Sequence, residues 1–111
     1  MKEYVLLKRI ELLEYHQTLL LQLMLDTNKD FYKLVITKKV SQRQVEAFFE
    51  MCEKLSMELE AQKAEGFVYF HPLFKEFQVS LPQNIDPEEM ITACLVQKLY
   101  LPLMTEFKKY L

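Results

Sequence analysis

The sequence predicts an all-α protein, because of its composition, its helix-capping signals and its helical apolar periodicity. The 111 residues include one Gly and four Pro, so strands and hairpins have few turn residues to connect them, whereas Leu, Glu, Lys and Met favour helix. Half of the residues are hydrophobic, which is enough to form a core without disulfides. We predict a single helical domain over residues 1–111: a compact bundle of about six helical segments, with a long N-terminal helix and a long central helix.

The N-terminal segment, residues 2–26, is expected to form one long helix. Six of its side chains follow an alternating spacing of four and three residues, the a/d pattern of a coiled coil, and we call this set the seam: Leu6, Ile10, Leu13, Gln17, Leu20 and Met24. Two interpretations stay open, an ordinary central core helix and an interface between subunits. In residues 19–25 only Gln22 is polar, so this half is expected to be buried nearly all round.

Gln17 is the one polar member of the seam, so the seam is also our candidate oligomer interface. A buried amide costs about 1–3 kcal/mol when its hydrogen bonds are unmet. A second Gln17 or a water molecule would satisfy it, and a lone polar residue in a seam can set register. Alternatively, its long side chain reaches solvent at the rim of a monomer.

Three capping signals mark the next helices. Asp30 is expected to cap a short helix that starts at Phe31. Ser41 with Gln44 forms a capping-box pattern, which predicts a third helix over about residues 42–65. The only glycine, Gly66, follows that helix, where a left-handed residue commonly ends it.

The C-terminal part is predicted to contain three shorter helices. The aromatic run 67–70 has no partner strand, so we interpret it as a connector packed on the core. Pro72 suits the first turn of a fourth helix that continues to about Leu81. Asp86 followed by Pro87 is a strong start for the fifth helix, and Pro102 opens the last.

Residues able to support chemistry are few, and we predict neither catalytic, cofactor-binding nor metal-binding residues. His16 beside the seam is interpreted as a partly buried structural histidine rather than a pH sensor. His71 occupies a helix start, and the sequence pairs it with no nucleophile or oxyanion donors. Cys52 and Cys94 lie on apolar helix faces without metal-ligand spacing, so both are expected to be unpaired, buried and inert.

The charge pattern argues against a nucleic-acid partner. The formal net charge is -2, although residues 29–43 are basic and residues 46–65 are acidic. Ser41–Val45 resembles the start of a helix-turn-helix, but the pattern continues as one helix with no break before a recognition helix. The charged segments could instead pair between subunits or form a solvated surface.

The charged residues of the N-terminal segment also indicate the expected subcellular location. Lys8, Arg9, Glu11 and Glu14 interrupt the apolar N-terminus, which fits neither a transmembrane span nor a secretory signal. We therefore predict no membrane partner, a cytoplasmic location and reduced thiols.

Several short motifs resemble the YhaI-like family of small helical proteins from Bacillus-type bacteria. They are Ile10-Glu11 with Leu13-Glu14-Tyr15, Phe31-Tyr32, Leu55-Ser56 with Glu58-Leu59, Ala61-Gln62-Lys63-Ala64, Gly66-Phe67-Val68, and Leu99-Tyr100 with Leu103-Met104. The resemblance implies an all-α fold, a bacterial cytosolic setting and no catalytic residues to transfer. Two positions that often hold glycine in the family pattern hold Lys39 and Lys98 here.

The resulting functional hypothesis is a non-enzymatic interaction protein or small regulatory or adaptor subunit that acts as a homo-oligomer. Its predicted partner is a second copy of itself, with another cytosolic protein as a further potential partner. The alternatives are a DNA-associated transcriptional regulator and a binder of a small apolar ligand in the bundle core.

Overall fold

The computed structural model of the chain is described for residues 2–24 and 28–111, which form six helices. They are α1 (Lys2–Leu23), α2 (Asp30–Thr37), α3 (Gln42–Ala64), α4 (His71–Val79), α5 (Pro87–Gln97) and α6 (Leu101–Lys108). The described ranges contain no strand. The all-α prediction with a long first and a long central helix is therefore confirmed, while the predicted helix end near residue 26 lies outside the described residues.

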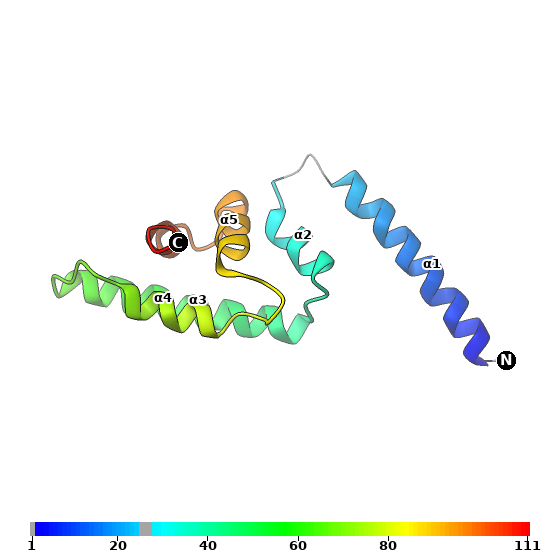
Figure 1. Ribbon diagram of the computed structural model, residues 1–111, viewed down its shortest axis with the longest axis horizontal. Helices are drawn as coiled ribbons and strands as arrows, with labels where there is room; N and C mark the ends of the chain where they lie inside the picture. The colour runs from blue at the N-terminus through cyan, green and yellow to red at the C-terminus, as the bar shows by residue number, and fades with distance from the viewer. Residues whose placement is uncertain (1, 25–27) are drawn as a thin grey trace.

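Helices α2–α6 pack around one core, and we call them the body. Within it, α3 packs on α4 and α6, and α5 packs on α2 and α6. Figure 1 shows α1 set apart from the body as a separate rod that carries the N-terminus. The chain consequently measures 64 × 29 × 19 Å along its principal axes, with α1 contributing to the longest.

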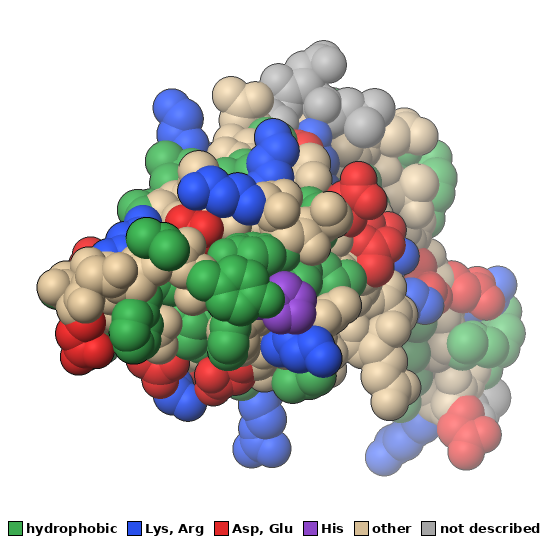
Figure 2. Space-filling view, turned by 60° about the vertical axis from the view of Figure 1, so that its left-hand side comes forward, with side chains coloured by type: hydrophobic (Ala, Val, Ile, Leu, Met, Phe, Trp, Pro, Cys, Tyr) green, Lys and Arg blue, Asp and Glu red, His purple; other side chains and the backbone are tan. Residues whose placement is uncertain are grey.

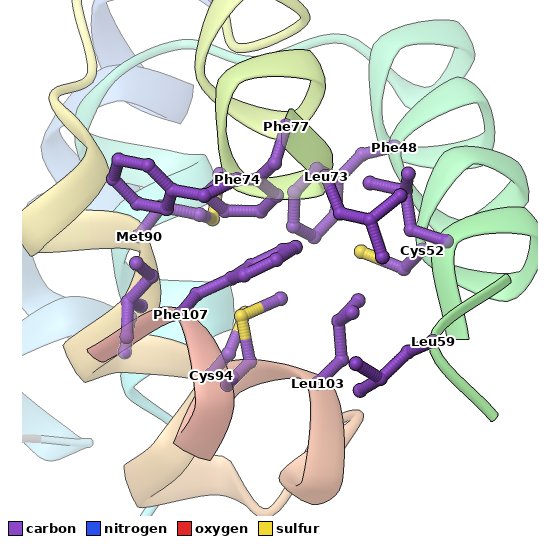
Figure 3. Packing of buried hydrophobic residues seen from close by; sticks show 14 of the residues in the cluster. Phe48, Cys52, Leu59, Leu73, Phe74, Phe77, Met90, Cys94, Leu103 and Phe107 are labelled. Atoms are coloured by element: carbon purple, nitrogen blue, oxygen red, sulfur yellow. The ribbon is translucent and has the colours of Figure 1, made fainter. Parts of the chain in front are cut away.

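The core of the body is aromatic and aliphatic, and it draws on α2–α6 and the connections between them. Figure 3 shows side chains from several helices pointing toward Phe107, and the ring centroids of Phe77 and Phe107 are 5.0 Å apart. Aromatic pairs at such spacing add to the hydrophobic gain of burial. The buried apolar set is Phe31, Phe48, Cys52, Leu55, Leu59, Phe70, Leu73, Phe74, Phe77, Ile85, Met90, Ile91, Ala93, Cys94, Leu103, Met104 and Phe107.

Two predicted helix starts are confirmed by their hydrogen bonds. Gln44 donates its backbone N–H to Ser41 Oγ (3.1 Å), and Ser41 donates its N–H to Gln44 Oε1 (2.9 Å), which completes the capping box of α3. Asp86 Oδ1 accepts from the N–H of Glu89 (2.8 Å) at the start of α5. These local contacts fix where both helices begin.

The predicted Asp30 cap is wrong. Asp30 is the first residue of α2, Lys29 stands at the N-cap without a side-chain cap, and the Asp30 carboxylate lies 3.7 Å from Lys33 Nζ. A distant residue takes over part of the capping role, because the Tyr32 N–H donates to Gln97 Oε1 on α5 (3.2 Å).

The connector 67–70 is packed on the core only at its last residue, so that prediction is wrong for most of the segment. Phe70 is buried and its N–H donates to the Tyr110 hydroxyl (2.8 Å), whereas Phe67, Val68 and Tyr69 are exposed. One anchored residue is enough to join α3 to α4. Helix α4 then ends at Val79, two residues before the predicted end.

Left-handed residues close three helices of the body. Gly66 (φ 92°) follows α3 as predicted, and Lys39 (φ 56°) and Lys98 (φ 61°) follow α2 and α5. Beyond each, a backbone N–H reaches back five residues: Val40 to Val35 O (2.9 Å), Phe67 to Gln62 O (3.0 Å) and Leu99 to Cys94 O (2.8 Å). This is the Schellman arrangement, so both lysines keep the conformation that glycine favours.

Replacing Lys98 with Gly is expected to stabilise the fold by about 0.5–1 kcal/mol. A left-handed conformation costs a residue with a Cβ about 1–2 kcal/mol, and the greater freedom of glycine in the unfolded chain offsets part of the gain. Urea denaturation measures the change. Lys75→Gly is the control, because Lys75 is exposed inside α4 and its replacement should destabilise by about 1 kcal/mol. Equal losses in both variants would show that the backbone at Lys98 carries no strain.

Candidate self-association surface

Helix α1 buries none of its residues, so the central-core interpretation of this helix is wrong. The second half, expected to be buried all round, is exposed at Leu20 and Leu23. The physical reason is that the body already encloses its aromatic core without α1. The large apolar side chains that α1 exposes are Tyr4, Val5, Leu6, Leu7, Ile10, Leu12, Leu13, Tyr15, Leu19, Leu20 and Leu23.

The structure places the seam as one continuous stripe on this free helix. Leu6, Ile10, Leu13 and Leu20 are each 50–65% exposed, and Gln17 between them is exposed too. Met24 follows in the turn after α1 and is half-buried. From Leu6 to Leu20 the stripe runs along roughly 21 Å of helix at about 1.5 Å per residue.

The exposed apolar area of α1 is comparable to the largest apolar patches on monomeric proteins, which are often functional. Nine of the exposed side chains are aliphatic, each between 40% and 78% exposed. Full burial of such a side chain is worth about 1.5–3 kcal/mol at roughly 25 cal/mol per Å², that is about 60–120 Å² each. At half exposure the nine side chains present on the order of 500 Å², while contiguous patches beyond a few hundred Å² commonly mark interaction sites.

A second apolar surface, which the sequence analysis missed, lies at the connector between α3 and α4. Phe67, Val68 and Tyr69 are exposed, Tyr69 stacks on His71 (centroids 5.9 Å apart), and Tyr110 meets both rings edge-on. Figure 2 shows apolar side chains gathered around a histidine on this side of the body. The aromatic run 67–70 was the available signal, but nothing in the sequence alone brought Tyr110 to it.

One hollow on the body, of about 640 Å³ between α2 and α5, is lined by charged side chains including Lys33, Asp86 and Glu89. Another of about 510 Å³ lies between α3 and the 80–83 turn, over Phe48 and Met51. The bundle core, where the alternative hypothesis places a small apolar ligand, is occupied by contacting rings such as Phe74 and Phe77.

The two histidines lie on different helices, His16 on α1 and His71 on α4. His16 is exposed on α1, so its expected partial burial is wrong, and its ring contact is with Tyr15 (6.0 Å). His71 is half-buried at the first residue of α4, as a helix-start position predicts. Among the described residues, His, Cys, Asp and Glu form no group of three or more placed to hold a metal ion.

The two cysteines are free and buried, which confirms their predicted state. Burial raises the pKa of the Cys94 thiol to about 12 and raises that of Cys52 as well, because the thiolate loses its hydration. The thiolate is the reactive form, so both side chains are poor nucleophiles in the folded chain.

Both thiols are expected to label with a disulfide reagent only as fast as the body unfolds. Labelling at pH 8 should be complete within minutes in urea and slow in buffer, and rapid native labelling of both would contradict the buried placement.

The raised pKa values of the two thiols also predict that stability depends on pH. Above a pH of about 8.5 the unfolded chain loses thiol protons that the folded chain keeps, so the free energy of unfolding should fall as pH rises. Urea midpoints at pH 7 and pH 10 measure that change.

Residues 41–45, which resemble the start of a helix-turn-helix, lead into the long helix α3. Helix α3 runs unbroken from Gln42 to Ala64, as expected. Two of the basic side chains in residues 29–43 are paired with acids, Lys33 with Asp30 and Lys38 with Glu89, both at 3.7 Å. Their positive charge is therefore locally offset.

These observations define a small all-helical protein whose long N-terminal helix buries none of its residues and exposes many large apolar side chains. No helix within residues 2–24 and 28–111 combines the length and apolarity needed to cross a membrane. A family model described as "Protein of unknown function (DUF1878)" matches residues 3–111. The chain therefore belongs to that family, and the match includes α1 as well as the body.

Proposed function

We propose that this chain is a non-enzymatic interaction protein that self-associates through α1, in the role of a small cytoplasmic regulatory or adaptor subunit. The observation that carries the proposal is the uncovered seam: four aliphatic side chains at coiled-coil spacing, each at least half exposed. A helix of this kind is stable in water when its apolar stripe is packed against another surface.

A second copy is the partner that the seam fits best. The nine exposed aliphatic side chains of α1, on the seam and beside it, present on the order of 500 Å² of apolar surface per chain, against the roughly 800 Å² that each partner contributes to an interface of standard size. The a/d spacing is the pattern by which a helix recognises another helix of the same kind. The filled core and the unbroken α3 give the ligand-binding and DNA-binding alternatives no comparable support.

Light scattering on the full chain, from about 1 to 100 μM, tests the proposal over the range of ordinary subunit affinities. The parent should be larger than one chain in the upper part of this range, and a monomer at tens of micromolar would contradict self-association. Gln17→Leu should raise the melting temperature and change the oligomer number or register, because the seam loses its polar member. Gln22→Leu is the matched control: Gln22 is equally a glutamine of α1, is exposed and lies off the seam.

If Gln17→Leu keeps the mass and register of the parent oligomer, the result contradicts the proposal that Gln17 sets the register. Self-association itself would still stand.

A further inference from the structure

We infer that two copies pair their α1 helices parallel and in register, with Gln17 facing Gln17 of the second copy and Arg9 facing Glu14. This inference rests on the proposed self-association and adds its orientation and chain number. Three features of α1 carry it: the residue types along the seam, the position of Gln17 and the charges beside the seam.

The seam residues alternate between the a and d positions of a heptad repeat. The spacing places Leu6, Leu13 and Leu20 at d positions, and Ile10, Gln17 and Met24 at a positions. Leucine at d with a β-branched residue at a favours parallel, two-stranded coiled coils, and Ile10 supplies such a residue. All of these positions except Met24 are exposed on α1, so a second helix can reach them without disturbing the body.

Gln17 distinguishes the two orientations. In a parallel pair, equivalent a positions meet, so the two Gln17 amides can each donate to and accept from the other. In an antiparallel pair, a positions meet d positions, and Gln17 faces a leucine such as Leu13. The amide then loses water without gaining a partner, so the parallel arrangement is favoured.

The charges beside the seam agree with that choice. Arg9 precedes Ile10 and occupies a g position, and Glu14 follows Leu13 at an e position. In parallel pairs a g side chain meets the e side chain five residues further along the other helix, so Arg9 meets Glu14 twice by symmetry. In antiparallel pairs e meets e, which brings Glu14 against Glu14. Among the described residues neither forms a salt bridge within its own chain, whereas the outward Lys8 is paired with Glu11 (3.7 Å).

Two features limit how much of α1 the pair covers. Glu3 occupies the a position one heptad before Ile10. The Glu3 carboxylates of the two copies would therefore repel each other at the exposed helix start. Val5, Leu12 and Leu19 lie at c positions, outside a two-stranded contact. A mass of four chains would cover this stripe too, and it would overturn the two-chain assignment.

A charge exchange tests the register. Arg9→Glu and Glu14→Arg should each weaken association about 10-fold, since each replaces two attractive charge pairs by two repulsive ones at the exposed edge of the contact. The double variant Arg9→Glu/Glu14→Arg should return to within about 3-fold of the parent. Lys8→Glu is the control for charge, because it alters net charge as Arg9→Glu does but points away from the seam. Additive losses in the double variant would overturn the Arg9–Glu14 contact.

Disulfide cross-linking tests the orientation without removing an apolar contact. Glu3→Cys chains treated with oxidised glutathione should form covalent dimers, because parallel helices place the two position-3 thiols together. The parent chain should form none, since its cysteines are buried. In an antiparallel pair the two position-3 thiols lie at opposite ends of the pair, and position 3 comes closest to the C-terminal end of the other α1. Cross-linking then occurs instead between Glu3→Cys and Leu23→Cys chains.

The outcomes separate the two proposals. A chain that stays monomeric at every concentration contradicts the proposed function. A dimer that cross-links only in the mixed experiment contradicts the parallel orientation and leaves self-association standing.

Discussion

Leu13→Glu is expected to shift the self-association of this chain to at least 100-fold higher protein concentration. Leu13 lies at the centre of the seam and is 65% exposed in the single chain. In the pair its replacement would place two carboxylates in an apolar contact, at a cost of several kcal/mol, and about 1.4 kcal/mol corresponds to each factor of ten in affinity. Sedimentation equilibrium of parent and variant measures the shift.

Tyr15→Glu is the matched control for this change. Tyr15 is 60% exposed, lies two residues away on the same helix and points away from the seam. Its variant adds the same charge to α1 and should associate within a few-fold of the parent. If both variants dissociate equally, the interface includes the whole circumference of α1, and the seam has no special role.

Phe77→Ala is expected to lower the free energy of unfolding of the body by about 3–5 kcal/mol. Phe77 is fully buried, and its ring contacts those of Phe48, Phe74 and Phe107. Removing the ring leaves a cavity among side chains supplied by three helices. Because domains of this size are stable by only about 5–15 kcal/mol, the variant should unfold at much lower urea.

Val79→Ala is the control on the same helix, since Val79 is 81% exposed at the end of α4. Its urea midpoint should stay close to that of the parent, with a change within about 0.5 kcal/mol. A small loss in Phe77→Ala would mean that the rings repack and that α4 contributes less to the core than its burial indicates.

Local signals allowed much of the fold to be predicted. The capping box at Ser41, the Asp86–Pro87 start and the left-handed Gly66 each act within a few residues, so the sequence carries them in full. Each of these features depends on neighbours in the chain.

Features that depend on distant residues were predicted less well. The Tyr32 N–H is satisfied by Gln97, which displaced the expected Asp30 cap. Lys54 of α3 pairs with Glu76 on α4 (2.9 Å), a partner that spacing along the chain does not indicate. Such partners are chosen by the packing of whole helices, which propensity and spacing do not determine.

The candidate self-association surface shows the same difference between features set by neighbours in the chain and features set by distant residues. Periodicity identified the seam, because it reports which residues share a face of a helix. It did not report what covers that face, so a core helix and an interface remained equally consistent with the sequence. The packing of α2–α6 around a core, with α1 outside it, contradicts the core-helix interpretation, and the interface stays a proposal.

Amide hydrogen exchange of the full chain at two protein concentrations tests the central claim most directly. An isolated helix opens readily, so α1 amides should exchange rapidly at about 1 μM and become strongly protected at about 100 μM, where ordinary subunit affinities favour the oligomer. The α3 amides should show the same protection at both concentrations, because the body does not depend on a partner. Protection of α1 that is independent of concentration would contradict self-association through this helix.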